Sequence, residues 1–309
     1  MAKKNKAAPT NLPASVMARL RNEAIKQNTD VNQILTRYAL ERLLYRIANS
    51  SHADRFILKG AFVYIAWLNA DRFRPTGDLD LLGTGENEPA ALTKTFIEIT
   101  STEVPDDGLV FDSESITANL IREGQQYEGV RISLTAHLGR ARIPVLIDIG
   151  FGDVVTPEAE ELTFPVLLDA PAPIIRAYPK ETVLAEKLEA MISIGRRTSR
   201  MKDFYDLLAL SRLFTFTGAS TSDAIKATFK RRQTALPKAT PAVLEDEFGS
   251  DRETQAQWSA FVSRNPLFIT PPELPDVLSE LQAFLMPVVI AAETGEPFDK
   301  TWEPNTGWT

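Results

Sequence analysis

Two aspartates stand one residue apart in the segment "RPTGDLDLLG", which covers residues 74–83. If this segment is a strand, the alternation of side chains places Asp78 and Asp80 on one face and Leu79 on the other. Two carboxylates held this close repel each other unless one is protonated or a cation lies between them. The pair therefore predicts either a shared proton or a cation site.

A third aspartate lies in the apolar segment "VLIDIG". Asp148 is flanked by Ile147 and Ile149, and burial of a lone carboxylate is unfavourable unless it has a partner. If its strand lies beside the strand of Asp78 and Asp80, three carboxylates converge, which is a set of oxygen ligands that suits Mg²⁺ or Mn²⁺. The alternative is an ordinary surface Asp-x-Asp pair, which a short motif does not exclude.

A glycine turn, "KGA", precedes the two aspartates by one expected helix. Gly60 separates a short alternating run from a longer apolar stretch, a pattern that predicts a strand, a tight turn and a buried helix. Exposed backbone N–H groups at the start of such a helix can bind phosphate. Lys59, Gly60 and Ala61 are therefore candidate nucleotide-binding residues.

A second group of charged residues lies in "AEKLEAMISIGRRTSRMKDFYDLLAL". Lys187 is on an expected helix, and the turn that follows is rich in cationic residues: Arg196, Arg197, Arg200 and Lys202. Positive charges that converge on a metal-bound triphosphate neutralise it, which is the main task in phosphoryl and nucleotidyl transfer. Asp203 and Asp206 share one helix face, where one of them could orient a cation or act as a base. A solvated, salt-bridged pair of helices is an equally well supported alternative.

Periodicity predicts the elements that would position these residues. Apolar spacing is helical over residues 12–50, with Asp30 as an N-cap, and a mixed sheet with helices follows. After the proline-rich connection "APAPIIRAYP", we expect helices over residues 182–195, 200–214, 222–232, 253–263 and 272–293. The polar, proline-containing tail "PFDKTWEPNTGWT" is expected on the surface. The predicted organisation is an N-terminal helical segment (residues 1–54), a sheet-containing core (55–177) and a helical C-terminal domain (178–309).

Composition narrows the classes of protein. The chain has 309 residues, no cysteine and a formal net charge of -7, so disulfides and thiolate metal sites are excluded. The acidic balance argues against a surface that coats nucleic acid generally, although "GRRTSRMK" and "KRRQ" could form a local phosphate-binding surface. No leader and no apolar run of membrane-spanning length is expected, so we predict a cytoplasmic protein without a membrane anchor.

Four ordered motifs resemble those of the AbiEii/AbiGii nucleotidyltransferase toxin family. They are "FILKGAFVYIAWLNADRFRPTGDLDLLG", "VLIDIGFGDVVTP", "AYPKETVLAEKLEAM" and "SRMKDFYDLLAL", and they lie within residues 56–210. The resemblance implies a polymerase-β-like nucleotidyltransferase fold for the core, so the expected class is α+β. It also implies a toxin of a type IV toxin–antitoxin or phage-abortive system, and some relatives add nucleotides to tRNA 3′ ends.

The resemblance assigns roles by position. The implied catalytic residues are Asp78, Asp80, Lys187, Asp203 and Asp206, and which of the last two is essential stays open. The implied nucleotide contacts are Lys59, Gly60, Ala61, Lys187, Arg197, Arg200 and Lys202, and the implied metal ligands are Asp78, Asp80 and Asp148. The sequence departs from the family pattern at Ala61, where glycine or serine is frequent, and at Gly77, where a basic residue is frequent.

The favoured hypothesis is therefore a metal-dependent nucleotidyltransferase that uses Mg²⁺ or Mn²⁺. It would transfer a nucleoside monophosphate from a nucleoside triphosphate to an RNA acceptor, with the tRNA 3′ end favoured, and release pyrophosphate. A cognate antitoxin is an expected partner, and a membrane is not. Two alternatives stay open: a phosphotransferase that moves the γ-phosphate, which similar folds also support, and a non-catalytic module that binds nucleotide or antitoxin.

Overall fold

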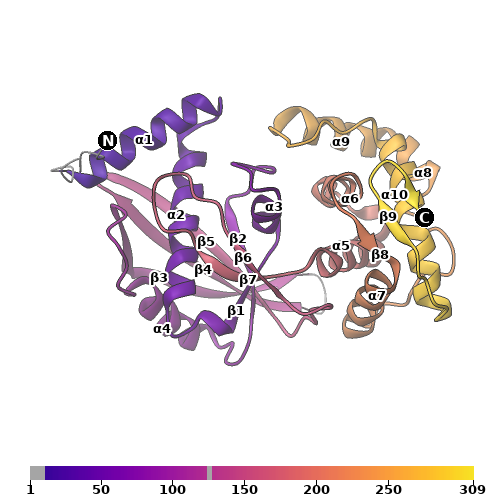
Figure 1. The fold of residues 1–309 in the computed structure, drawn as a ribbon, viewed down its shortest axis with the longest axis horizontal. Coiled ribbons are helices and arrows are strands. Elements are labelled where there is room, and N and C mark those ends of the chain that lie inside the picture. Colours follow the sequence, from indigo (N-terminus) through magenta and orange to yellow (C-terminus); the bar gives the residue numbers. More distant parts are fainter. Residues whose placement is uncertain (1–10, 124–126) are drawn as a thin grey trace, which may run out of the picture. The chain divides into compact units, whose positions relative to one another are not determined.

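The computed structural model describes residues 11–123 and 127–309, which form two compact units. Among the described residues, unit 1 comprises those up to Gly152 together with Glu161–Ala177, and unit 2 comprises Asp153–Glu160 and Tyr178–Thr309. Unit 1 combines helices with a mixed sheet, and unit 2 is mainly helical (Figure 1). The predicted α+β class is confirmed.

Unit 1 is built on a sheet whose strands run in the order β3-β4-β5-β2-β1-β7-β6. The strands are β1 (Phe56–Lys59), β2 (Asp78–Gly83), β3 (Leu109–Glu123), β4 (Tyr127–Leu138), β5 (Ala141–Phe151), β6 (Glu160–Thr163) and β7 (Ile174–Ala177). The central strands β2 and β5 are parallel, and β2 pairs antiparallel with β1. Parallel neighbours need a long crossover connection, so the chain places residues from distant segments side by side.

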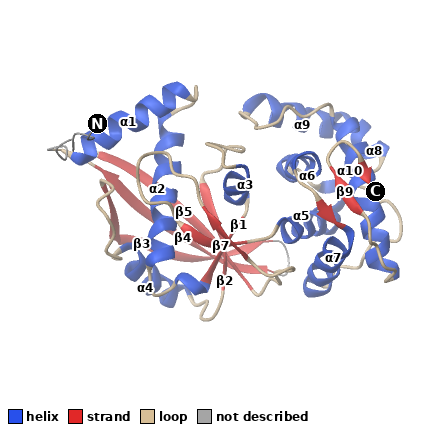
Figure 2. Ribbon diagram, in the orientation of Figure 1, coloured by secondary structure: helices blue, strands red, loops and turns tan. Residues whose placement is uncertain are grey.

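Helices cover this sheet and supply its core. They are α1 (Leu12–Lys26), α2 (Val31–Asn49), α3 (Ala61–Leu68) and α4 (Pro89–Thr100), with a short 3-10 turn, η1 (Ala53–Arg55), before β1. The helices α2 and α4 contact each other and the sheet, and Figure 2 shows them beside the red strands. The predicted N-cap is confirmed, because the Asp30 side chain accepts a hydrogen bond from the backbone N–H of Asn32 at 2.7 Å.

Unit 2 is a helical bundle around one long apolar helix. Its elements are α5 (Lys180–Ile194), η2 (Gly195–Arg197), α6 (Met201–Leu213), β8 (Phe216–Thr217), α7 (Gly218–Arg232), α8 (Asp246–Ser250), α9 (Arg252–Arg264), α10 (Leu274–Thr294), β9 (Thr301–Glu303) and β10 (Gly307–Trp308). The helix α10 contacts α6, α7 and α8. The five helices predicted after residue 178 are all present, but α8 and the three short strands were missed.

The length and composition of α10 are those of a membrane-spanning helix, with a mean hydropathy of 1.4 over its most apolar window. This differs from the expectation that no apolar run would reach such a length. Its residues Val277, Leu281, Phe284 and Val288 are nevertheless fully buried inside unit 2. Its apolar composition is therefore that of a core helix.

The prediction of a surface tail is wrong for Trp302. Trp302 is only 8% exposed, and its indole N–H donates to the backbone carbonyl of Ser211 at 2.7 Å. Trp302 and Trp308 both pack against Phe284 of α10, with ring centroids 4.6 and 6.2 Å apart. Burial of aromatic surface anchors the tail to α10 through its tryptophans, while most of its polar residues stay exposed.

Replacement of Trp302 by alanine is expected to lower the free energy of unfolding of unit 2 by about 3–5 kcal/mol, the usual effect of deleting a buried aromatic side chain. Thermal denaturation followed by circular dichroism measures the change. The matched control is Phe268→Ala, because Phe268 is 44% exposed and its removal should shift the transition far less. Equal shifts for the two variants would contradict a structural role for the tail.

Candidate active site

The two aspartates of β2 lie on one face of the sheet, as the alternation predicts. Asp78 and Asp80 are half-buried, whereas Leu79 and Leu81 are fully buried on the opposite face. The hydroxyl of Thr76 donates to Asp78 Oδ1 at 2.8 Å, which fixes one of the two carboxylates. The core contacts of the leucines therefore aim both acidic side chains away from the core.

Strand pairing brings the third aspartate to the same face. In the parallel pair of β2 and β5, Asp80 lies directly opposite Asp148. Residues paired in this way share a face, with Cβ atoms about 5 Å apart. Across the sheet, the row continues from Asp148 to Arg131 on β4 and from Asp80 to Lys59 on β1. Two carboxylates are thus flanked by one cationic residue at each end of the row.

The turn at Gly60 lies directly against the carboxylate of Asp80. Gly60 has φ 71° and ψ −154°, a backbone conformation suited to glycine. A Cβ atom at this position would lie 1.9 Å from Asp80 Oδ2. Ala61 is the first residue of α3 and is buried. The turn therefore places the start of α3 against the carboxylate of Asp80, as only glycine allows.

Arg131 is a site residue that sequence reasoning missed. Its Nε and Nη2 donate to the two oxygens of Asp148 at 2.7 and 2.6 Å. The pKa of the Arg131 guanidinium is raised by its hydrogen bonds to Asp148 and by the charge of that residue, and the charges of Asp78 and Asp80 add to this effect. Four charged side chains therefore interact at this point of the sheet. The only local signal was a cationic residue at an alternate position of "GVRISLTAHL".

The carboxylates fit a divalent cation in part. Among the described residues, no group of three or more His, Asp or Glu side chains is arranged as a ready ligand set, and both oxygens of Asp148 accept from Arg131. Asp78 and Asp80 are hard oxygen donors on one face. Mg²⁺ commonly binds through one or two carboxylates and completes its shell with water and substrate phosphates. The pair on β2 therefore fits Mg²⁺ or Mn²⁺, and Asp148 as a third ligand stays a prediction.

The second predicted group forms an ion-paired cluster in unit 2. The ammonium of Lys187 lies 3.1 Å from Asp203 Oδ1 and 2.6 Å from Asp206 Oδ2, and both carboxylates are fully buried. Nε of Arg200 donates to Asp203 Oδ2 at 2.6 Å. The structure thus shows direct contacts among four residues of the predicted cluster. The alternative of an ion-paired helix pair is partly right, since the pairs exist, but the two carboxylates are not solvated.

Charge pairing controls the protonation of Asp203. Burial by itself would raise the pKa of this carboxyl, but the charges of Lys187 and Arg200 and their hydrogen bonds outweigh burial and lower the pKa to about 2. Asp203 is therefore ionised at neutral pH. A carboxylate in this state is an ion-pair partner that holds Lys187 in place.

The protein is expected to lose stability in acid through Asp203. The folded pKa of about 2 lies below the ordinary value of 3.8, so the folded state favours the ionised form. This contribution is fully present above about pH 4, is lost as the pH falls toward 2, and amounts to roughly 2 kcal/mol. Chemical denaturation between pH 5 and pH 2.5 should show this part of the fall in the wild type and not in Asp203→Asn. The exposed Asp223→Asn variant should behave like the wild type, and an unchanged fall in Asp203→Asn would contradict the assignment.

The remaining predicted cations differ in their surroundings. Arg196 pairs with Glu247 at 2.7 Å, and Arg197 and Lys202 are exposed. In the run "KRRQ", Arg232 points into a cluster of carboxylates, with Nη atoms 3.3 Å from Asp153, 3.3 Å from Glu186 and 2.9 Å from Glu189. The prediction that this whole run tracks phosphate is therefore wrong for Arg232, because its charge is already used within unit 2.

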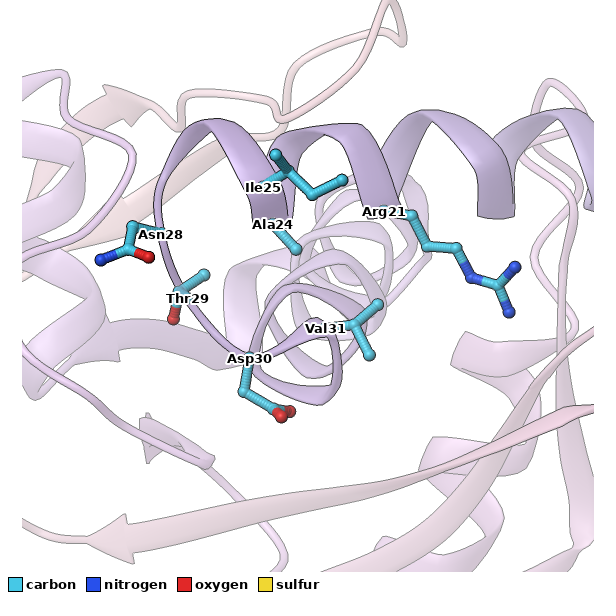
Figure 3. A pocket seen from close by; sticks show the side chains of 7 residues that line it. All are labelled: Arg21, Ala24, Ile25, Asn28, Thr29, Asp30 and Val31. Carbon is cyan, nitrogen blue, oxygen red and sulfur yellow. The ribbon is translucent and has the colours of Figure 1, made fainter.

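A hollow of about 630 Å³ lies elsewhere in unit 1, at the turn between α1 and α2 (Figure 3). It is lined by Arg21, Ala24, Ile25, Asn28, Thr29, Asp30 and Val31. None of these is a predicted site residue, and Asp30 is already used as the N-cap of α2. The hollow is therefore separate from the row of charged residues on the sheet.

Comparisons with known proteins bear on the function. The model of the nucleotidyl transferase AbiEii toxin family, of type IV toxin–antitoxin systems, matches residues 42–280, more than half of the chain. The crystal structure of JHP933 from Helicobacter pylori is similar with 14% identity and a TM-score of 0.44, over 83% of this chain and 90% of that one. An H. pylori protein provisionally described as a nucleotidyltransferase has 13% identity and a TM-score of 0.45, over 85% and 95%. No curated protein shows a significant match. The family match confirms the resemblance inferred from the four motifs.

Proposed function

The chain belongs to the family of AbiEii nucleotidyl transferase toxins of type IV toxin–antitoxin systems, and from this premise we propose that it is a metal-dependent nucleotidyltransferase with an RNA acceptor. The observation that carries the proposal is the row of charged residues on the sheet, in which Asp80 faces Asp148 in register and Asp78 lies on the same face. The family also implies a cognate antitoxin as a partner. We place the reaction in the cytoplasm, where nucleoside triphosphates and tRNA are found.

In unit 1, Asp78 and Asp80 would hold the cation, and Asp148 would complete its ligands. A divalent cation bound there supplies the positive charge that activates an attacking oxygen and stabilises a leaving pyrophosphate. Lys59 ends the same row of side chains, and the first turn of α3 presents backbone N–H groups that lack helical partners. Gly60 lets this turn approach Asp80 closely. These groups would bind the phosphates of the nucleotide and orient them for in-line attack.

For unit 2, the family resemblance assigns Lys187 a role in nucleotide binding. Asp203 and Asp206 hold its ammonium by two buried ion pairs, so they act by positioning Lys187. The exposed Arg197 and Lys202, together with Arg200, offer positive charge for phosphates of the nucleotide or of the acceptor. The 3′ end of tRNA is the acceptor that we favour, because a terminal ribose hydroxyl is an accessible nucleophile.

The test is a labelling experiment on the full chain with each of the four nucleoside triphosphates, labelled at either the α- or the γ-phosphate. We expect the α-label to enter purified tRNA in the presence of Mg²⁺ or Mn²⁺, with release of pyrophosphate and no transfer of the γ-label. Total cellular RNA and an RNA-free protein extract serve as competing acceptors. Label found only in protein would overturn the RNA assignment.

The same experiment separates the two alternatives. Transfer of the γ-label instead of the α-label would identify a phosphotransferase. Binding of nucleotide without metal, without pyrophosphate release and without label transfer would identify a non-catalytic binding module. The carboxylates of Asp78 and Asp80 on one sheet face, with Asp148 in register beside Asp80, favour a metal-dependent transfer reaction over a non-catalytic module, because such oxygen donors suit Mg²⁺ or Mn²⁺.

A further inference from the structure

Asp148 is a proposed metal ligand, but both of its carboxylate oxygens accept hydrogen bonds from Arg131. The proposed function alone does not explain this pair. The planar guanidinium binds both carboxylate oxygens at 2.7 and 2.6 Å, a bidentate geometry that is stronger and more directional than a single ion pair. The side chain of Asp148 is 13% exposed and that of Arg131 is 41% exposed. The carboxylate is therefore held firmly, while its cationic partner can reach solvent.

Asp148 has two competing neighbours in register. On β4 its partner is Arg131, and on β2 its partner is Asp80, where the cation is proposed to bind. A carboxylate with both oxygens engaged by a guanidinium cannot present the same oxygens to a metal ion without giving up part of that pair. Arg131 also lies within the electrostatic reach of Asp78 and Asp80, whose charges act on it. A guanidinium and a metal ion at this point therefore compete for one set of negative charges.

We propose that Arg131 is a positioning residue whose ion pair with Asp148 prevents this carboxylate from binding the cation until a nucleoside triphosphate is bound. The inference rests on the proposed function. Without nucleotide, the charge of Arg131 opposes a divalent cation and withholds the third carboxylate. The triphosphate adds several negative charges at the same point, which favours the cation and gives the guanidinium an alternative anion to bind. Arg131 would thus make metal binding depend on nucleotide binding.

The test is isothermal titration of Mn²⁺ into the full chain in the absence of nucleotide. Arg131→Gln should bind Mn²⁺ at least about tenfold more tightly than the wild type, because a positive charge near the ion is removed and a carboxylate is freed. The double variant Arg131→Gln/Asp148→Asn should lose this gain. With a non-hydrolysable nucleoside triphosphate present, the difference between wild type and Arg131→Gln should shrink.

Two outcomes would overturn the inference. Mn²⁺ binding by folded Arg131→Gln that is no tighter than in the wild type would show that Arg131 does not compete with the cation. A gain that persists in the double variant would show that Asp148 is not what Arg131 withholds. If Arg131→Gln does not fold, Arg131→Lys decides the question: it keeps the charge but not the bidentate geometry, so a smaller gain is expected and no gain overturns the inference.

Failure of this inference can be told apart from failure of the proposed function. The same titration on Asp78→Asn/Asp80→Asn tests the cation site itself, whatever Arg131 does. Loss of Mn²⁺ binding in that variant, together with no gain in Arg131→Gln, would leave the transferase site standing and remove only the role of Arg131. Unchanged Mn²⁺ binding in that variant would remove the proposed metal site.

Discussion

Replacement of Asp80 or Asp78 by asparagine is expected to abolish nucleotide transfer, with a fall in rate of at least about 10³-fold, because the cation and its several kcal/mol of charge stabilisation are lost. Asparagine keeps the shape of the side chain but removes its negative charge. Transfer of the α-phosphate label to RNA, measured with each variant, is the direct readout. Any growth arrest caused by expression of the protein should disappear in parallel.

The control for these variants is Asp54→Asn, which makes the same chemical change at an exposed carboxylate of the same unit. This variant should keep full activity. Circular dichroism should show that all three variants retain the fold, since asparagine is nearly isosteric with aspartate. Full transfer activity in folded Asp80→Asn or Asp78→Asn would contradict the proposed role of these aspartates in binding the catalytic cation.

The second large effect is expected for Gly60→Ala. The added Cβ would lie 1.9 Å from Asp80 Oδ2, and the backbone φ of 71° is unfavourable for alanine. We expect the rate of transfer to fall by at least about 10²-fold, because misplacement of a catalytic group by about 1 Å has this effect. Backbone strain should lower the free energy of unfolding by about 1–3 kcal/mol. Steady-state kinetics and thermal denaturation measure the two effects separately.

The matched control is Gly77→Ala in the segment just before β2. An added Cβ at Gly77 would have no heavy atom within 4 Å, so stability and transfer should change little. A loss of activity in Gly60→Ala without any displacement of Asp80, judged from a structure of the variant, would contradict the proposed reason. Equal losses in the two glycine variants would contradict it as well.

The sequence predicted those features of the fold that local patterns specify. Helical periodicity located α5, α6, α7, α9 and α10, and alternation placed Asp78 and Asp80 on one face. The short strands β8, β9 and β10 carry too few residues for a recognisable pattern. Burial of Trp302 depends on Phe284, which lies in another element. Tertiary packing, which composition does not reveal, therefore overrode the polar character of the tail.

The site residues divide in the same way: a local motif identifies some of them, and strand pairing between distant segments places the others. The motif itself identified the two aspartates of β2, but the position of Asp148 opposite Asp80 depends on a parallel pairing between segments far apart in the sequence. Arg131 was missed because a cationic residue on the outer face of a half-buried strand is ordinary. Only the register of β4 against β5 gives it a partner. The close approach of Gly60 to Asp80 likewise follows from strand pairing, and the sequence indicated only a turn.

We propose that Asp78 and Asp80 together bind the divalent cation that carries the triphosphate. The most direct test is calorimetric titration of a non-hydrolysable nucleoside triphosphate, with Mn²⁺ present throughout, into the wild type and into Asp78→Asn/Asp80→Asn. We expect metal-dependent binding to the wild type and a loss of that dependence in the double variant. Equally tight, metal-dependent binding to the folded double variant would contradict it.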